Sequence, residues 1–212
     1  MYLPAHFAEA RADALDHIVQ AHPLGTLVRV GPNGLDADHV PFELDPRAGP
    51  QGTLRAHVAR ANPLWREARD GDEVLVIFRA ADAYVSPNWY PSKHEQHRQV
   101  PTWNYQVAHA HGRIAIRDDE KFVRGLVARL TRTHEAGTGN PRPWKMGDSA
   151  PEYIDGMLAA IVGIEVAIER IVVKSKLSQN KEPRDRLNAA EELRQRGSVE
   201  IADAMRDAGD EA

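Results

Sequence analysis

The sequence has no cysteine among its 212 residues. Without thiols the chain cannot form disulfides, use thiolate catalysis or bind zinc through cysteine, and this composition fits a reducing cytoplasm. No apolar run approaches the roughly 20 residues that a membrane-spanning helix needs. The first residues, Met1–Phe7, lack the basic and apolar regions of a secretory signal. We therefore expect a cytoplasmic protein that does not enter a membrane and whose mature chain begins at Met1.

Signatures of several common activities are also missing. The Gly-x-Gly-x-x-Gly fingerprint of dinucleotide-binding folds and the P-loop sequence do not occur, and neither does the Gly-x-Ser-x-Gly elbow of hydrolases. The formal net charge of −4 gives no overall attraction to nucleic acid, although a local basic patch is compatible with it.

Histidine is abundant, with ten residues, and raises the question of a metal site. His109 and His111 are two positions apart and share one face of a strand, which suits two metal ligands, but no third ligand is close in the sequence. His94 and His97 are separated by two residues, whereas the zinc-binding His-Glu-x-x-His motif has three between its histidines. We expect hydrogen-bonded surface histidines and no bound metal.

Alternation of apolar and polar residues predicts β-strands over much of the chain. The clearest example is Leu54, Ala56 and Val58, whose side chains point to one face of a strand. A continuous apolar stretch predicts another strand over Glu73–Arg79. The predicted strands lie within residues 24–58, 73–79, 107–117 and 161–176.

Helical spacing of apolar residues predicts helices at the margins of this sheet. One covers residues 7–21 and ends before Pro23. A second begins after a cap at Asp118 or Asp119. Its apolar face is Phe122, Val123, Leu126, Val127 and Leu130. Two charged helices, around 187–196 and 199–208, are separated by Gly197.

Short connections between strands, without a regular strand–helix–strand rhythm, favour an antiparallel sheet. We predict a mainly β (α+β) protein, an antiparallel barrel with peripheral helices. No linker rich in proline, glycine, serine or charge divides the chain. We therefore expect one domain over residues 1–182, followed by a C-terminal helical extension over 183–212.

Aromatic residues are concentrated between Tyr84 and Tyr105, which hold two of the four tryptophans and three of the five tyrosines. Large planar rings beside hydrogen-bonding side chains suit a flat ligand with a polar edge. A barrel rim or a subunit interface explains the same enrichment. The residues alone leave these interpretations equally open.

Two polar clusters follow predicted strands. Arg60 and Asn62 stand at a strand end, an arrangement that suits a phosphate group, and a solvated arginine at a turn is the simpler alternative. The segment Lys176–Lys181 closes the last strand with a hydroxyl and two amides. Such groups can bind the edge of a heterocycle, and they can equally cap a strand and begin a turn.

Motifs along nearly the whole chain together resemble the PaiB family, the FMN-binding negative transcriptional regulators. They are Met1–Phe7, His39–Phe42, His57–Trp65, Tyr84–Tyr90 with Lys93, Val100–Tyr105 and Lys176–Asn180. The resemblance implies an antiparallel split β-barrel of the FMN-binding type, related to the pyridoxamine-phosphate-oxidase-like flavoproteins. It also implies a homodimer with two flavin sites shared between subunits.

The resemblance further implies which residues bind the cofactor FMN. Arg60 and Asn62 would meet the phosphate, with His57 nearby. The other candidates would lie around the isoalloxazine ring or its partner-subunit edge, and they are Thr102, Trp103, Asn104, Gln106, Lys176, Gln179 and Asn180. One departure is visible, because Arg79–Asp82 stands where the family pattern leads us to expect a glycine-containing turn.

Three functions remain open at this point. The first is a flavoprotein that holds FMN while the flavin supplies the redox chemistry, such as a flavin-dependent oxidoreductase that does not bind DNA directly. A repressor would need its C-terminal helices to enter a DNA groove, yet carboxylates outnumber the arginines in residues 183–212, so the charge does not support DNA binding. A haem-binding split barrel is the third possibility, because His39, His57, His109 and His111 offer axial ligands.

Overall fold

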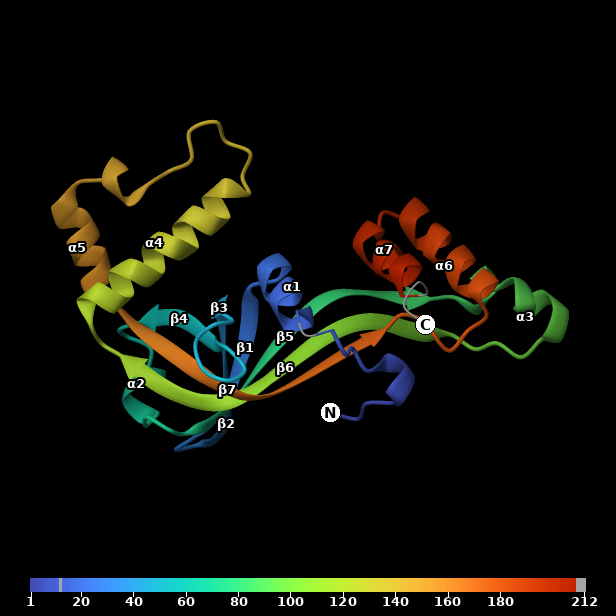
Figure 1. The fold of residues 1–212 in the computed structure, drawn as a ribbon, viewed down its shortest axis with the longest axis horizontal. Helices are drawn as coiled ribbons and strands as arrows, with labels where there is room; N and C mark the ends of the chain where they lie inside the picture. Colours follow the sequence, from blue (N-terminus) through green and yellow to red (C-terminus); the bar gives the residue numbers. More distant parts are fainter. Residues whose placement is uncertain (12, 209–212) are drawn as a thin grey trace. The chain divides into compact units, whose positions relative to one another are not determined.

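The computed structural model describes residues 1–11 and 13–208 of the chain (Figure 1). The chain divides into two compact units, each built from segments that are distant in sequence. Unit 1 comprises Met1–Ala21, Arg79–Ala108 and Val172–Ala212, and unit 2 comprises His22–Phe78 and His109–Ile171.

Seven strands form one antiparallel sheet. They are β1 (Leu24–Gly31), β2 (Gly34–Pro41), β3 (Glu43–Asp45), β4 (Thr53–Ala59), β5 (Glu73–Val85), β6 (Thr102–Arg117) and β7 (Ile161–Lys176). Their order is β2-β1-β5-β6-β7-β4-β3, so β2 and β3 are the two ends of the sheet and the barrel is split, not closed. This confirms the predicted fold class. Strands β5, β6 and β7 each contribute residues to both units.

Strand β4 positions the first predicted cluster. Its residues Leu54, Ala56 and Val58 are buried, as their alternation predicted. The strand pairs with β7 along its whole length and ends with Ala59 opposite Ile161. The backbone N–H of Arg60, the next residue, donates to the carbonyl oxygen of Ala160 at 2.8 Å. The chain therefore leaves β4 directly beside the start of β7.

Helix α4 (Glu120–Ala136) covers part of unit 2 and contacts β4. The Asp119 side chain caps it by accepting a hydrogen bond from the Phe122 backbone N–H at 2.8 Å, one of the two caps that the sequence predicted. The predicted apolar face packs inward, with Val123 in a small core beside Leu158 of α5 (Pro151–Ala159). The short helix α2 (Leu64–Glu67) follows β4 in the same unit.

Unit 1 contains α1 (Ala14–Ala21), α3 (Pro91–Gln96), α6 (Pro183–Gln195) and α7 (Val199–Asp207). The apolar faces of α6 and α7 form a core with the ends of the strands. Its members are Val85, Tyr90, Leu177, Ala189, Ala190, Leu193, Ile201, Ala202 and Met205. No helix in the described part of the chain is both long enough and apolar enough to cross a membrane.

The predicted helix over residues 7–21 is only partly correct. Residues Ala5–Phe7 form a 3₁₀ turn, and Ala8 forms a β-bridge with Lys174. The Glu9 backbone N–H donates to the carbonyl oxygen of Val173 at 3.1 Å. Because β7 takes these backbone groups, the segment is extended there and α1 begins only at Ala14.

The segment Arg79–Asp82, where the family pattern led us to expect a turn, continues β5 without interruption to Val85. The Asp82 carboxylate accepts hydrogen bonds from Arg79 and, at 2.7 Å, from the indole nitrogen of Trp103. These contacts link β5 to β6 at the aromatic segment.

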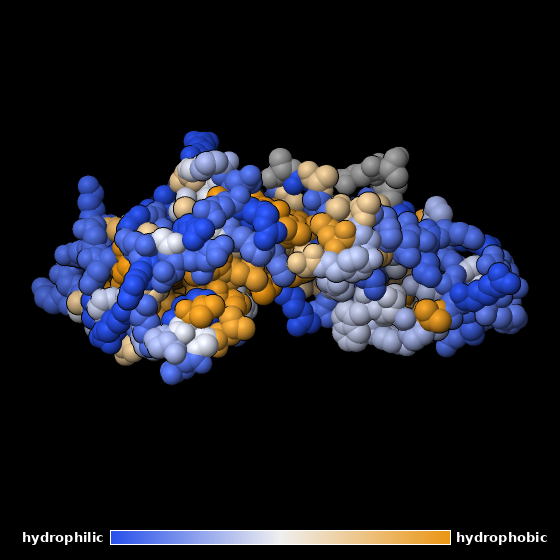
Figure 2. All heavy atoms as spheres, turned by 90° about the horizontal axis from the view of Figure 1, so that it is seen from below, coloured by the Kyte–Doolittle hydropathy of each residue, from blue (hydrophilic) through white to orange (hydrophobic). Residues whose placement is uncertain are grey.

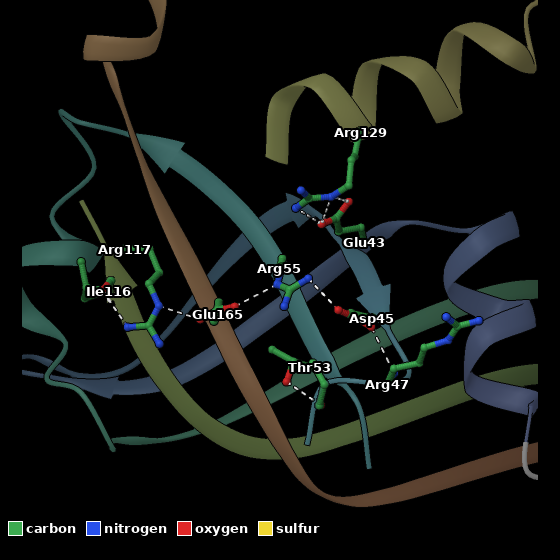
Figure 3. Close-up of polar contacts among 10 residues, drawn as sticks. Glu43, Asp45, Arg47, Thr53, Arg55, Ile116, Arg117, Arg129 and Glu165 are labelled. Carbon is green, nitrogen blue, oxygen red and sulfur yellow. Dashed lines mark hydrogen bonds and ion pairs between the residues drawn. The ribbon is translucent and has the colours of Figure 1, made fainter. Parts of the chain in front are cut away.

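A network of ion pairs ties the strands of unit 2 together (Figure 3). Glu165 on β7 accepts from Arg55 Nε at 2.8 Å and from Arg117 Nε at 2.6 Å, and Arg55 also donates to Asp45 at 2.8 Å. Burial raises the pKa of Glu165, but the hydrogen bonds from its two arginines outweigh that effect and leave the pKa below its ordinary value. Carboxylates thus neutralise the partly buried Arg55 and Arg117.

Candidate functional site

Arg60 is held in one orientation at the exit of β4. Its Nε donates to the carbonyl oxygen of Ala159 at 2.7 Å, and one terminal nitrogen donates to that of Ile161 at 3.2 Å. Both terminal nitrogens also donate to the Asp118 carboxylate, at 2.9 and 2.6 Å. This hydrogen bonding raises the pKa of Arg60 and lowers that of Asp118. A carboxylate therefore occupies the fork that the sequence assigned to phosphate.

Asn62 is also engaged. Its amide nitrogen donates to Asp38 at 2.7 Å, and its amide oxygen accepts from the Leu64 backbone N–H at 2.8 Å. The Trp65 indole nitrogen donates to the Arg60 carbonyl oxygen at 2.9 Å, which closes the turn. Arg60 and Asn62 thus lie in one ordered turn, and each carries an acidic partner on β2 or after β6.

A cavity of about 370 Å³ lies beside Arg60. Its lining includes the acidic residues Asp118, Asp119, Glu120 and Asp155. These carboxylates make the cavity negatively charged. A phosphate group can therefore bind Arg60 there only if it replaces the carboxylate partner of that arginine.

His57 lies on β4, three residues before Arg60. Its Nδ1 is buried and makes no hydrogen bond with the described residues. Burial lowers the pKa of His57, so the neutral imidazole is favoured. The ring lines a largely apolar cavity of about 440 Å³, together with residues of α4 and Trp144. An unpaired buried nitrogen is a hydrogen-bonding group available to a ligand.

The residues predicted to lie around the isoalloxazine ring all belong to unit 1. The Lys176 ammonium donates to the Thr102 hydroxyl and, at 2.7 Å, to the Trp103 carbonyl oxygen. The Gln106 amide donates to Ser175 at 3.1 Å. The side chains therefore join the start of β6 to the end of β7.

Asn104 is completely buried beneath α7. Its amide nitrogen donates to the Ser178 hydroxyl at 2.9 Å and lies 3.3 Å from the Met205 sulfur. Its amide oxygen has no partner among the described residues. Ser178 itself adopts a left-handed backbone conformation with φ of 67°. The hydrogen bond to the Ser178 hydroxyl therefore helps to fix the orientation of the Asn104 amide.

Gln179 caps the end of β7. This is one of the two roles that the sequence predicted for this segment, the other being to bind the edge of a heterocycle. It accepts from the Leu177 backbone N–H at 2.8 Å and donates to the Ser175 carbonyl oxygen at 2.6 Å. Asn180 is exposed in the turn that follows. Gln106 and Gln179 both line a cavity of about 950 Å³ in unit 1, near the upper end of the size range of ligand pockets.

Unpaired buried atoms indicate that the predicted cofactor residues are compatible with FMN. Six buried polar side-chain atoms have no hydrogen-bond partner among the described residues, and two of them belong to the ten predicted cofactor residues. These two, His57 Nδ1 and Asn104 Oδ1, can each serve a polar ligand. The arginine fork, amides and lysine supply the donors that a phosphate and a flavin edge require.

His109 and His111 lie on β6 with their ring centroids 6.2 Å apart. Burial lowers the pKa of both imidazoles. In residues 1–11 and 13–208, no group of three histidine, aspartate or glutamate side chains is arranged to hold a metal ion.

Comparison with known proteins identifies the family. Residues 1–170 match the profile described as "Putative FMN-binding domain". The chain is 30% identical over 210 residues to the Bacillus subtilis "Protease synthase and sporulation protein PAI 2". This match covers 98% of this chain and 97% of the relative. The chain belongs to the PaiB family. The family description makes FMN its cofactor.

Solved structures confirm the fold of this PaiB-family chain. Protein Rv2991 from Mycobacterium tuberculosis superimposes with a TM-score of 0.56 at 14% identity, covering 86% of this chain and 94% of that one. The FAD and haem binding protein from Mycobacterium smegmatis gives a TM-score of 0.52 at 20% identity, covering 79% and 72%. These likenesses establish the split barrel.

The sequence did not point to the acidic partners of the predicted residues. Asp38 and Asp118 lie far from Asn62 and Arg60 in sequence and meet them only because the strands pair. The only local signal was the position of Asp118 before α4, and we interpreted it as a helix cap. Ser175, which accepts a hydrogen bond from the Gln106 amide, was likewise not among the predicted residues.

Proposed function

We propose that this protein binds FMN with its phosphate at the exit of β4, through Arg60 and Asn62, with His57 nearby. The observation that carries the proposal is the Arg60 guanidinium, which the carbonyl oxygens of Ala159 and Ile161 hold in one orientation. The buried, unpaired Nδ1 of His57, three residues earlier on the chain, is a second group open to a ligand. An oriented guanidinium offers charge-assisted hydrogen bonds to an anionic ligand, and an unpaired buried nitrogen offers a further hydrogen bond to a polar ligand.

Phosphate binding at Arg60 proceeds by exchange of partners. The contacts to the carbonyl oxygens of Ala159 and Ile161 orient the guanidinium and are independent of Asp118. When a phosphate takes the place of the carboxylate, the fork is already oriented, and less side-chain entropy is lost. Asp118 is half-exposed and can turn to solvent.

We place the flavin ring among Thr102, Trp103, Asn104 and Gln106, and Lys176, Gln179 and Asn180. Amides and an ammonium group offer hydrogen bonds to the carbonyl and N–H edge of the ring, and the exposed indole of Trp103 offers a stacking face. Bound FMN would supply electron transfer, and the protein would hold and orient it.

We further propose a homodimer with flavin sites shared between subunits. The aromatic segment exposes Tyr84, Trp103 and Val100, the last with 69% of its surface accessible. Tyr84 and Trp103 stack edge to face with centroids 6.2 Å apart. Apolar side chains also gather on the face of the molecule seen in Figure 2. Exposed apolar patches of this kind favour association.

The regulatory role of the family is a separate question, and we propose that it does not run through DNA contacts of α6 and α7. Carboxylates already pair Arg184, Arg194, Arg196 and Arg206, and Arg186 is buried. Phosphate contacts need cations that are free to neutralise DNA. We favour a cytoplasmic regulator that acts through a protein or small molecule, and a flavin-dependent oxidoreductase is the alternative.

A visible absorption spectrum of freshly purified protein tests the cofactor. Flavin bands that are released as FMN on denaturation support the proposal. A Soret band would instead establish a haem protein, and a featureless spectrum that FMN titration leaves without saturable binding would refute flavin binding.

A further inference from the structure

Unit 1 contains buried positive charge without a carboxylate partner. Lys174 on β7 is only 8% exposed. Its ammonium nitrogen donates to the Tyr2 carbonyl oxygen at 3.2 Å and lies 5.8 and 5.3 Å from the ring centroids of Tyr2 and Tyr105. One neutral oxygen and two aromatic faces are thus the partners of a cation that is almost out of water.

Two more lysines, which are partly buried, also lack a carboxylate partner. Lys176 donates to the Thr102 hydroxyl and to the Trp103 carbonyl oxygen. Lys181 donates to the Gln99 amide oxygen at 2.6 Å. Within the described residues, none of the three ammonium groups forms an ion pair with a carboxylate.

In unit 2, by contrast, two arginines that are withdrawn from water have carboxylate partners. Buried Arg29 donates to Glu67 at 2.6 Å, and Arg55 lies between Asp45 and Glu165. Neighbouring like charges that are partly withdrawn from water disfavour one another, so leaving three lysines unpaired costs stability. A site that retains unpaired positive charge despite this loss of stability is a candidate for binding an anion.

We propose that Lys174 and Lys176, assisted by Lys181 and the Thr102 hydroxyl, bind the phosphate group of a small molecule. Lys174 and Lys176 are two positions apart on β7, so their side chains leave the same face of the strand about 7 Å apart and can reach one anion. A phosphate dianion offers enough charge and acceptor atoms for two ammonium groups and a hydroxyl. Burial lowers the pKa of Lys176, Tyr105 opposes this, and Lys174 and Lys181 lower it further, so an anion would relieve the repulsion.

These lysines follow residue 170, where the match to the family profile ends. The inference rests in part on the proposed function, because Lys176 is also one of the residues that we place beside the flavin ring. Two sources can supply the phosphate: FMN itself, or a second phosphorylated molecule that binds beside the flavin.

The test uses the full chain with ¹³C-dimethylated lysines, which keep their charge and give few signals because the protein has only six lysines. Inorganic phosphate is the first probe and potassium chloride of equal ionic strength is its control. We expect a saturable shift of the Lys174 and Lys176 signals with phosphate alone. Signals that stay constant, or that respond equally to chloride, overturn the proposal.

The same titration distinguishes the two sources. A shift with FMN but not riboflavin, with no further response to inorganic phosphate, assigns the flavin phosphate to this site. A phosphate response that persists with FMN bound assigns a second ligand. FMN binding is followed independently by absorbance, so failure of the lysine site leaves the proposed function standing or falling on its own measurement.

Single variants separate a binding role from a structural one. Lys174→Met and Lys176→Met should each weaken phosphate binding by about tenfold, read from the lysine signal that remains. Removing an unpaired buried charge should leave the thermal midpoint unchanged or higher without phosphate. Lys121→Met, at an exposed position on α4, is the matched control and should change neither quantity. Variants that lose stability but keep the phosphate response would show that the lysines only support the fold.

Discussion

Arg60 and Asp118 form a two-pronged ion pair across 58 positions of sequence, with nitrogen–oxygen distances of 2.9 and 2.6 Å. The carboxylate fills the fork in the way that two phosphate oxygens would. Asp118 is therefore a built-in competitor of an anionic ligand at this arginine. The pair gives a direct way to test the proposed phosphate site.

Asp118→Asn should bind FMN more tightly, by roughly threefold to tenfold, because Arg60 then gives up a weaker partner. Its affinity for riboflavin should stay the same, since riboflavin has no phosphate. Arg60→Ala should lose the preference for FMN over riboflavin. Both affinities are measured by flavin fluorescence titration. Glu169→Gln, which removes one carboxylate partner of Arg113 in the same unit, is the control and should leave FMN binding unchanged. Equal affinities for both flavins in the unmutated protein would remove the phosphate assignment.

His57 should make folding depend on pH. Its pKa lies below the ordinary 6.5 in the folded protein, so the unfolded chain binds more protons near that pH. Its contribution to stability is therefore complete above the ordinary pKa and is lost as the pH falls below it. His57→Phe should reduce the loss of unfolding free energy between pH 8 and pH 5, measured by urea denaturation.

The pKa values of His109 and His111 are also lowered in the folded protein, so His57→Phe should retain part of the pH dependence. His94→Gln, at an exposed position on α3, is the matched control and should follow the unmutated protein. A His57→Phe curve parallel to that of the unmutated protein would show that the imidazole is not buried in solution.

The strands were predictable because their signal is local. Leu54, Ala56 and Val58 alternate in sequence and are buried in β4, and the last strand covers Ile161–Lys176, the range that was predicted. The Asp119 cap is equally local. The extended segment at Ala8 was not predictable, because its backbone pairs with β7, whose residues lie far along the chain.

The candidate site was predictable only in its donors. Arg60 and Asn62 were visible as a polar turn after a strand, but their acidic partners arrive from β2 and from the end of β6. The buried charge of Lys174 was hidden for a similar reason, because its cover is Tyr2 at the opposite end of the sequence. Residue type gives the chemistry of a side chain, and only the fold gives its partner.

A dimer should depend on the exposed aromatic segment. Light scattering should give twice the chain mass of 23.6 kDa, and Val100→Asp should reduce it towards the monomer because a charge would be buried in an apolar interface. Leu35→Asp replaces an even more exposed apolar residue in the β1–β2 hairpin and should leave the mass unchanged. A monomer at micromolar concentration that binds FMN tightly would contradict a shared site.

Gly112 on β6 marks a place where two strands approach very closely. A Cβ added there would lie 2.2 Å from the carbonyl oxygen of Ala167, a backbone atom that cannot turn away. Gly112→Ala should therefore destabilise the protein by about 1–3 kcal/mol, the usual cost of overpacking. Urea denaturation measures it. Gly147→Ala, where a Cβ meets nothing within 4 Å, is the control. Equal stability of the two variants would mean that the strands separate more than described.

The C-terminal helices should stabilise unit 1 and not read DNA. Leu193 on α6 is 2% exposed in the core, whereas Leu187 on the same helix is 45% exposed. Leu193→Ala should cost about 2–5 kcal/mol of unfolding free energy, and Leu187→Ala should cost little. Deleting the chain after Lys181 should lower the thermal midpoint or weaken dimerisation more strongly still, because it uncovers Tyr90 and Leu177. The decisive contrary result is a gel shift: full-length protein that binds a promoter fragment with sequence preference at physiological salt, while the truncated dimer does not, would make these helices the DNA-reading element.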